Sequence, residues 1–292
     1  MRVLSLFDGI SCGMVALEKA GGQIVDRYVA YEIEPNAIAV SESNYPQIEH
    51  CGNVVGADFT KYKGFDLVIG GSPCQGFSVA GKRLNFEDPR SKLFFEYVRA
   101  LEEVKPKYFL LENVIMKKEW EDIISEILGV EPIKIESSLV SGGMRKRNYW
   151  TNIPDVKQPD DKHITFQSIV DSGIVENEKA YCLTLHRGNA RDYFKKRQTN
   201  IVFEPSNTGE YTVKNKKITI VFKRSPDKSP YTFDVNIPDG RYNIRAINRN
   251  ESERLQTLPD NYTRAISESR ACECLGNGWT VDVIAHIFKN LK

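Results

Sequence analysis

The chain has 292 residues, 41% of them hydrophobic and 27% charged, with a formal net charge of +1. This length allows one large domain, or a large domain with a smaller one. No apolar run approaches the ~18–20 residues of a membrane-spanning helix, and the six cysteines are too few for a disulfide framework in a chain of this length. We therefore expect a reduced, cytoplasmic protein with no signal peptide and no metal site, since Cys272 and Cys274 have the wrong spacing for a zinc pair.

Basic residues are concentrated in the second half of the sequence. Residues 1–150 contain 18 Lys and Arg against 21 Asp and Glu, a net charge of −3, whereas residues 181–249 contain 14 against 6, a net charge of +8. This asymmetry is typical of a nucleic-acid-contacting module joined to a domain that binds a small molecule. A solvated basic surface explains the charge count alone equally well.

Short apolar strands alternate with amphipathic helices over residues 1–150. This order predicts a mostly parallel sheet covered by helices on both faces. In such sheets ligands bind beyond the carboxyl ends of the strands, where the motifs described below lie. Strands are predicted at Val3–Phe7, Val25–Ile33, Leu67–Ile69 and Tyr108–Leu111, and helices at Gly13–Ala20, Asn36–Asn44, Ser91–Val104 and Glu119–Leu128.

The pattern changes after Pro154. Short β-like segments separated by Gly, Pro, Asn and Asp follow, at Tyr211–Val213, Lys217–Phe222 and Tyr231–Val235, and a helical pattern returns at Leu275–Leu291. We therefore predict an α/β protein with two domains. Residues 1–156 and 263–292 form the larger domain, and residues 157–262 form a smaller, irregular β-rich domain.

A turn containing glycine, Leu6–Gly13, joins the first strand to the first helix. Glycine lets a ligand approach the backbone, and a helix N-terminus offers free N–H groups. Glu32, at the end of the second strand, can accept hydrogen bonds from both hydroxyls of a ribose. The turn lacks the Gly-x-Gly-x-x-Gly pattern of a pyrophosphate site, so S-adenosylmethionine fits better than a dinucleotide. Asp58 can accept from an adenine amino group, although a solvated carboxylate is the ordinary alternative for either acid.

Cys74 follows Pro73 in a turn after the apolar strand Phe65–Ile69, where a reactive thiol would be displayed. A nucleophile requires the thiolate, and a buried, apolar cysteine is the common alternative. Glu112 lies at the end of the next apolar strand, where a buried carboxyl group could donate a proton.

Two arginines follow further along the chain. If the segment around Tyr149 is a strand, Arg145 and Arg147 point to the same side. Two guanidinium groups beside a cysteine and a glutamate suit an anionic or carbonyl-bearing substrate.

Together these segments resemble the DNA (cytosine-5) methyltransferases, over Leu4–Trp150 and Ile244–Leu291. The motifs Phe-x-Gly, Pro-Cys-Gln, Glu-Asn-Val and Arg-x-Arg occur in the family's order. Gln75–Arg83 looks like the active-site loop of bacterial members, whereas Arg145–Trp150 and Gly278–Val281 look closer to the animal de novo enzymes. The resemblance implies a Rossmann-like S-adenosylmethionine-dependent methyltransferase domain and a target-recognition domain. Since no regulatory domain accompanies them, we expect a bacterial or phage protein.

The resemblance implies that Cys74 attacks C6 of a cytosine that has left the duplex, after which C5 takes the methyl group. Glu112 would bond N3 and the exocyclic amine, Arg147 would bond the O2 carbonyl, and Arg145 would support the nucleophile or a phosphate. S-adenosylmethionine would be converted to S-adenosylhomocysteine. The residues expected to hold the cofactor are Phe7, Asp8, Gly9, Ile10, Glu32, Ile33, Asp58, Phe59, Pro73, Leu93, Asn277 and Trp279.

Double-stranded DNA is the expected partner, and a restriction endonuclease for the same site is a candidate second partner. In the recognition domain some basic residues would read guanine edges and others would hold phosphates. Solvated or phosphate-directed side chains are the commoner case. DNA contacts are expected from Gln75, Ser78, Lys82, Arg83, Arg187, Lys195, Lys196 and Arg197.

The sequence departs from the family pattern in three places. Ser11 and Cys12 stand where many bacterial members have glycines, and Gly143 replaces a glutamine. The late Gly-Asn-Ser-Val signature is altered at Gly276–Val281. None of these changes removes a core catalytic group, so we expect an active enzyme.

Three other functions differ in the residues that they require. A transfer-RNA-modifying branch shares the scaffold, but Gln75–Lys82 matches the DNA-modifying members better. A catalytically silent regulatory module would lack catalytic residues, yet Cys74, Glu112, Arg145 and Arg147 are all present. A nucleotide-dependent oxidoreductase would need the dinucleotide motif that is missing here.

Overall fold

The computed structural model describes residues 1–22, 24–72, 89–185, 188–221 and 230–292. These residues form two compact units. The first unit comprises Met1–Ser137, Lys146–Asp160 and Gly278–Lys292, and the second comprises Ser138–Arg145 and Asp161–Asn277. Residues 138–145 and 263–277, predicted in the larger domain, belong to the second unit, and residues 157–160, predicted in the smaller domain, belong to the first. The division into a catalytic and a recognition domain stays a prediction.

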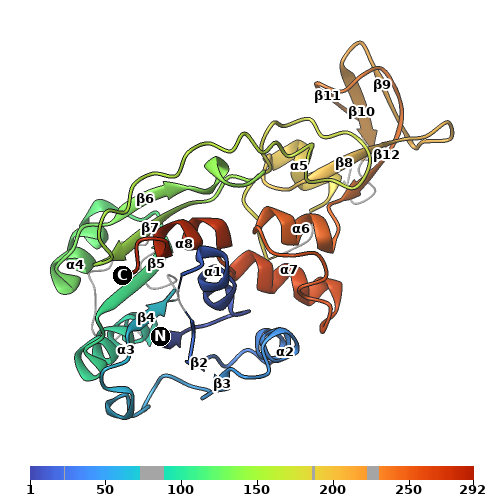
Figure 1. The fold of residues 1–292 in the computed structure, drawn as a ribbon. Helices are drawn as coiled ribbons and strands as arrows, with labels where there is room; N and C mark the ends of the chain where they lie inside the picture. The colour runs from blue at the N-terminus through green and yellow to red at the C-terminus, as the bar shows by residue number, and fades with distance from the viewer. Residues whose placement is uncertain (23, 73–88, 186–187, 222–229) are drawn as a thin grey trace. The chain divides into compact units, whose positions relative to one another are not determined.

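A seven-stranded sheet forms the centre of the first unit (Figure 1). Its order is β3-β2-β1-β4-β5-β7-β6. The first five strands in this order are parallel, and β7 is antiparallel to both β5 and β6. The predicted mostly parallel sheet is therefore confirmed. The strands are β1 (Arg2–Leu6), β2 (Arg27–Tyr31), β3 (Glu49–His50), β4 (Leu67–Gly70), β5 (Tyr108–Val114), β6 (Ile133–Glu136) and β7 (Lys146–Thr151).

Helices cover both faces of this sheet, as predicted. They are α1 (Cys12–Ala20), α2 (Pro35–Asn44), α3 (Pro89–Val104), α4 (Lys118–Leu128) and α8 (Val281–Phe288), with a short 3₁₀ turn, η1 (Thr60–Tyr62). Val68 packs in one core with Phe94 and Tyr97 of α3. Its neighbour Ile69 points to the opposite face, where a Cβ on Gly13 of α1 would lie only 2.4 Å from the Ile69 Cδ1 atom. A larger residue at this position would require the Ile69 side chain to move.

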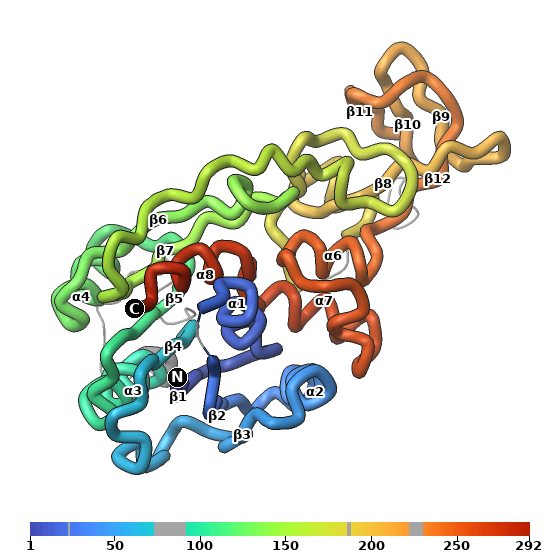
Figure 2. The backbone as a smooth tube through the Cα atoms, in the orientation of Figure 1, coloured from blue at the N-terminus to red at the C-terminus, as the bar shows by residue number. Residues whose placement is uncertain are grey.

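Helix α8 lies beside α1 (Figure 2), and Lys19 pairs with Asp282 between them at 2.8 Å. We expected one helical pattern over Leu275–Leu291, but the structure has two helices, with Gly278–Thr280 between them. Glycine is a poor helix former, and the break turns the indole of Trp279 away from the helical course toward the strand ends.

Strand register fixes the geometry of the sheet's carboxyl edge. Leu6 pairs with Tyr31 on one side and with Gly70 on the other, and Gly70 pairs with Leu111. The four residues therefore form one row. The residues that follow them along the chain leave the sheet at the same edge, so the motifs predicted to act together start from one line.

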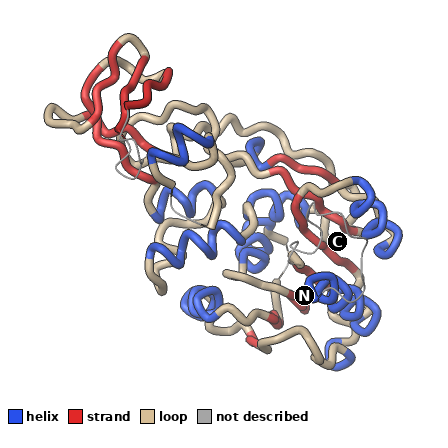
Figure 3. Tube along the Cα trace, turned by 180° about the vertical axis from the view of Figure 1, so that it is seen from behind, coloured by secondary structure: helices blue, strands red, loops and turns tan. Residues whose placement is uncertain are grey.

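The second unit contains a five-stranded antiparallel sheet in the order β11-β10-β9-β12-β8 (Figure 3). Phe194 stacks on Phe233 at 4.9 Å in its aromatic core, and Phe203 meets Tyr242 edge-on. The predicted β-rich second part is confirmed. Its elements are β8 (Ile201–Pro205), β9 (Tyr211–Lys214), β10 (Lys217–Val221), β11 (Pro230–Asp234), β12 (Gly240–Ala246), α5 (Ala190–Lys196), α6 (Arg249–Leu255) and α7 (Glu268–Asn277). A 3₁₀ turn, η2 (Ser137–Leu139), precedes β7.

Ion pairs support the start of α6. Arg245 donates two bonds to the fully buried carboxylate of Glu251, at 2.7 and 2.8 Å, and a third to Glu204 at 2.7 Å. Glu251 also forms a capping box with Asn248. Because such fork-shaped pairs are geometrically specific, they fix how β12 runs into α6. Within the described ranges, no helix is long and apolar enough to cross a membrane.

Candidate active site

The turn after β1 has an unusual backbone. Phe7, Gly9 and Ser11 have φ values of 57°, 61° and 57°, in the left-handed region that favours glycine. The backbone N–H of Gly9 donates to Glu32 Oε2 at 2.8 Å. A Cβ on Gly9 would meet no atom within 4 Å. The hydrogen bond to Glu32 therefore fixes the turn, and the space next to the Gly9 Cα atom is open, as ligand binding over this backbone requires.

Glu32 has a fixed position at the end of β2. Its Oε1 atom accepts from the backbone N–H groups of Ile33 and Glu34, at 2.7 and 2.9 Å. A carboxylate oxygen has two lone-pair sites, so both sites of Oε1 are used, whereas Oε2, which accepts only from Gly9, can accept one further bond from a ligand hydroxyl. The Ile33 side chain beside it is 67% exposed and offers an apolar surface next to the carboxylate.

Asp8 is held inside the turn. Tyr28 donates to its Oδ1 atom at 2.7 Å, and Ser11 donates to Oδ2 at 2.5 Å. Burial raises the pKa of Asp8 above its usual value near 3.8, although hydrogen bonds from Ser11, Ser5 and Tyr28 oppose the shift. The contacts of Ser11 and Tyr28 with Asp8 could not be predicted from the sequence, because no regular residue spacing indicates which hydroxyl group lies next to a given carboxylate in the fold.

Asp58 and Phe59 precede η1. Asp58 is exposed, and its Oδ1 atom accepts from the backbone N–H and the hydroxyl of Thr60, which hold the pKa of Asp58 below its usual value. Phe59 is fully buried, with the guanidinium of Arg99 4.5 Å above its ring. Phe59 therefore supports the carboxyl edge of the sheet from inside the core, and the partly buried Phe7 and Leu93 pack against the same core. Ile10 is also buried.

Glu112 is a tightly held carboxylate at the carboxyl edge of the sheet. It lies in β5, is only 8% exposed, and both of its oxygens are engaged. Arg147 of β7 places its Nε atom 3.0 Å from Oε1, and the Trp279 indole donates to Oε2 at 3.1 Å. A Cβ on Gly71, just after β4, would lie 3.2 Å from Oε2 and 3.1 Å from the indole nitrogen. The structure thus brings Glu112, Arg147 and Trp279 together beside the end of β4.

Asn113 connects the two strand ends. Its Nδ2 atom donates to the backbone oxygen and the hydroxyl of Ser72, at 3.3 and 3.4 Å. Ser72 is the last described residue before the predicted nucleophile motif. Asn113, the middle residue of the Glu-Asn-Val motif, had no predicted role; in the structure it holds the chain where it leaves β4.

Arg145 belongs to the second unit. Because β7 begins at Lys146, the strand alternation expected for Arg145 does not reach it. Its guanidinium is 3.4 Å from the Cys182 sulfur and donates to the Gly276 oxygen at 3.2 Å. The next residue of the predicted pair, Arg147, belongs to the first unit.

The segment that ends at Arg145 is tightly fixed within the second unit. The Lys179 ammonium donates to the backbone oxygens of Ser138, Ser141 and Ile164, at 2.6, 3.1 and 2.6 Å. A Cβ on Gly143 lies 3.3 Å from a Leu255 methyl group, closer than most side chains allow. The departure from glutamine at this position therefore accompanies close packing.

The basic residues of α5 make contacts within the second unit. Lys195 lies 3.8 Å above the Tyr231 ring, Lys196 pairs with Asp192 at 3.0 Å, and Arg197 pairs with Glu176 at 3.2 Å. The Lys196–Asp192 pair is exposed, and exposed ion pairs contribute little to stability. Asn277 is exposed at the end of α7. Seven predicted site residues lie outside the described residues: Pro73, Cys74, Gln75, Ser78, Lys82, Arg83 and Arg187.

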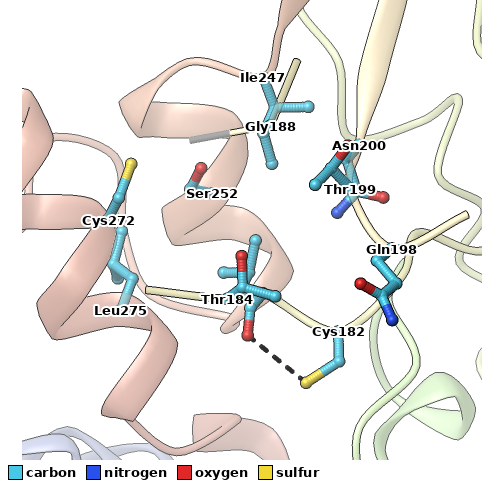
Figure 4. Close-up of a pocket in the computed structure, with 11 residues that line it drawn as sticks. Cys182, Thr184, Gly188, Gln198, Thr199, Asn200, Ile247, Ser252, Cys272 and Leu275 are labelled. Carbon is cyan, nitrogen blue, oxygen red and sulfur yellow. Dashed lines mark hydrogen bonds between the residues drawn. The ribbon is translucent and has the colours of Figure 1, made fainter. Parts of the chain in front are cut away.

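A pocket of about 380 Å³, measured with its solvent-open mouth, lies in the second unit (Figure 4). Its lining includes Cys182, Gln198, Ser252 and Cys272. Cys182 donates to the Leu183 oxygen at 3.6 Å. Most polar groups here are committed to the protein itself; Ser252, for example, donates to its own helix at 2.8 Å. None of the predicted site residues lines this pocket.

Comparison with known proteins decides the family. Residues 1–128 and 138–292 match the model of the C-5 cytosine-specific DNA methylases. This chain belongs to that family. The match runs through the predicted recognition segment and leaves out only residues 129–137, and the resemblance drawn from the motifs is confirmed.

Two curated relatives match one part of this chain. The orphan methyltransferase M.SPRI of Bacillus phage SPR is 43% identical over 122 residues, which are 39% of this chain and 26% of the relative. The type II methyltransferase M.Eco47II of Escherichia coli is 45% identical over 116 residues, 38% of this chain and 27% of the relative. The match thus spans about a quarter of each relative's length.

A solved structure, the Entamoeba histolytica methyltransferase EhMeth, resembles the whole chain. The TM-score is 0.73 at 16% identity, with 100% of this chain and 99% of that chain covered. A likeness at this identity concerns the fold. The predicted Rossmann-like methyltransferase domain with a smaller β-rich domain is confirmed.

Proposed function

We propose that this protein transfers a methyl group from S-adenosylmethionine to C5 of cytosine in a specific sequence of duplex DNA. The observation that carries the proposal is the position of Glu112. Its carboxylate lies beside the end of β4, from which the chain continues into Pro73-Cys74-Gln75, and Arg147 and Trp279 hold both of its oxygens. Family membership supports the same reaction.

Glu112 and Arg147 suit a cytosine ring. The carboxyl group of Glu112 would bond N3 and the exocyclic amine, and Arg147 would donate to the O2 carbonyl. The Glu112 and Arg147 side chains are largely buried at the carboxyl edge of the sheet. A hydrogen bond to a developing charge is stronger where water has little access. Arg145 would support the nucleophile or a backbone phosphate.

Cys74 would supply the nucleophile. Its thiolate sulfur forms a bond to C6, and the electron pair of the C5–C6 double bond moves into the ring, where Glu112 stabilises it. C5 becomes a nucleophile and accepts the methyl group. Loss of the C5 proton to a base and departure of the sulfur restore the double bond and the thiolate. The reaction requires such a covalent step because cytosine C5 is otherwise a poor nucleophile.

The carboxyl edge of the first unit fits the cofactor. Gly9 leaves open space above the turn, Glu32 keeps one acceptor site on Oε2, and Ile33 offers an exposed apolar face. Glu32 would accept from the ribose hydroxyls, and Asp58 from the adenine amino group. When bound there, S-adenosylmethionine would supply the methyl group as a sulfonium. The remaining predicted contacts are Phe7, Asp8, Ile10, Phe59, Pro73, Leu93, Asn277 and Trp279.

Duplex DNA is the proposed substrate, and the target cytosine must leave the stack to reach a cysteine. The basic second unit would hold the phosphates and read bases through α5 and Arg187. Gln75, Ser78, Lys82 and Arg83 would contact DNA around the position that the base vacates. A restriction endonuclease for the same sequence would be a partner of such an enzyme.

Methyl transfer with purified protein tests the proposal. Methyl-labelled S-adenosylmethionine is incubated with unmethylated duplex DNA or with transfer RNA, and the nucleosides are separated. We expect label in 5-methyldeoxycytidine with the wild-type protein and none with Cys74→Ser. Label confined to 5-methylcytidine from RNA would contradict the DNA substrate, and substantial DNA methylation by Cys74→Ser would contradict the covalent mechanism.

A further inference from the structure

A line of hydrogen-bonded side chains runs from the turn after β1 to β3. Tyr28 and Ser11 donate to the two oxygens of Asp8. The Ser11 hydroxyl is 2.6 Å from that of Ser41 in α2, and the Ser41 hydroxyl is 3.1 Å from Nε2 of His50 in β3. The turn after β1, β2, α2 and β3 are therefore connected through this line.

The carboxylate at one end sets the direction of these bonds. Ser11 donates its single hydroxyl proton to Asp8 Oδ2, so toward Ser41 its oxygen can only accept. The 2.6 Å contact then requires Ser41 to donate to Ser11, and Ser41 in turn accepts from the Nε2–H of His50. The other ring nitrogen of His50, Nδ1, is buried with no partner among the described residues. Each group in the line thus has one role, and His50 is its terminal donor.

The line compensates for two features of the turn. Ser11 adopts a φ of 57° although it has a Cβ, a conformation that costs free energy outside glycine. Ser11 and Ser41 are also fully buried, and buried hydroxyls need partners. The hydroxyl that makes Ser11 differ from the glycine expected in bacterial relatives is the group that joins Asp8 to Ser41. Sequence alone shows the difference but not its partner.

We propose that Ser41 and His50 are positioning residues for cofactor binding, which act on the Asp8–Gly9 turn through Ser11. The inference rests on the proposed function, since it assumes that this turn holds S-adenosylmethionine. Loss of the Ser41 hydroxyl leaves the buried Ser11 oxygen without its donor and loosens the side chain that holds Asp8 Oδ2. The turn would then have to be ordered on binding, which lowers affinity. The effect falls on the KM for S-adenosylmethionine more than on kcat.

Calorimetric titration with S-adenosylmethionine and S-adenosylhomocysteine tests this inference. Ser41→Ala is compared with Ser43→Ala, an exposed serine of the same helix. We expect Kd to rise about tenfold for Ser41→Ala, as for the loss of one hydrogen bond in a line that ends on a charged group. Ser43→Ala is expected to bind as the wild type does.

His50 supplies a second, independent pair of variants. His50→Gln places an amide N–H near the position of Nε2 and should keep Kd within about threefold of wild type, whereas His50→Leu removes the donor and should approach Ser41→Ala. This rescue by the conservative change distinguishes donation from simple packing. It also serves if Ser41→Ala does not fold.

The outcomes are distinguishable. Failure of the wild-type protein to bind either ligand would overturn the proposed function, and this inference with it. Normal binding by the wild type together with equal Kd values for Ser41→Ala and Ser43→Ala would overturn the inference alone. Equal Kd values for His50→Gln and His50→Leu would also overturn it.

Discussion

Replacement of Glu112 by glutamine changes one atom at the centre of the candidate active site. The carboxylate accepts from Arg147 at 3.0 Å and from the Trp279 indole at 3.1 Å, and both partners are donors. A glutamine side chain offers one acceptor and one donor. If its oxygen faces Arg147, its amide N–H groups face the indole N–H, and one buried donor loses its partner.

Two magnitudes follow from this geometry. Leaving the indole N–H without an acceptor should lower the free energy of unfolding by about 1–3 kcal/mol. Loss of the group that handles N3 of the base should lower the methyl-transfer rate by ~10²–10⁴, equivalent to about 3–5 kcal/mol in the barrier. Trp279→Phe removes the same indole bond but leaves the carboxyl group in place. Its stability should fall by a similar amount, while its rate at saturating cofactor should fall by about tenfold or less.

Single-turnover methyl transfer at saturating S-adenosylmethionine measures the rates, and urea unfolding measures the stabilities. The expected pattern is two variants of similar stability whose rates differ by at least about tenfold. Equal rates for Glu112→Gln and Trp279→Phe would refute a chemical role for Glu112 and leave it a structural one. A rate for Glu112→Gln equal to the wild-type rate would remove it from the mechanism.

Two further predictions concern the second unit. Lys179→Met deprives three backbone oxygens of their ammonium donor and should lower the free energy of unfolding by about 2–4 kcal/mol; a urea-unfolding midpoint equal to that of wild type would contradict this role. Hydrogen bonds from Asn248 and Arg254 hold the pKa of Asp171 below its usual value of 3.8. The contribution of Asp171 to stability is complete above its pKa in the unfolded chain and disappears as pH falls through its lower pKa in the folded protein. The Tm of the wild type should therefore lose its advantage over the Tm of Asp171→Asn between pH 5 and about 2. A constant difference in Tm over this range would contradict the linkage.

The carboxyl edge of the sheet could be predicted because period and position determine it. Buried runs such as Tyr108–Leu111 identify strands, and parallel pairing brings their ends into one row. Glu32 and Glu112 both lie at this edge as expected. The sequence could not give the partner of Glu112, however, since Trp279 is 167 positions away and reaches it only because the chain leaves helical structure at Gly278.

The basic residues of α5 show where composition stops being informative. A pair such as Asp192 and Lys196 has helical spacing and could have been expected. The contacts of Lys195 with Tyr231 and of Arg197 with Glu176 depend on the folded sheet. A charge count identifies the basic unit, but side-chain partners decide which cations are already engaged.

Methylation in a cell tests the central claim most directly. Plasmid DNA is recovered from a host without cytosine methylation that expresses the wild-type protein or Cys74→Ser, and is then sequenced after bisulfite treatment. The account predicts protected cytosines in one fixed sequence context with the wild type and none with the variant. Unprotected DNA from cells that contain soluble, S-adenosylmethionine-binding protein would contradict it, as would the same protection with Cys74→Ser.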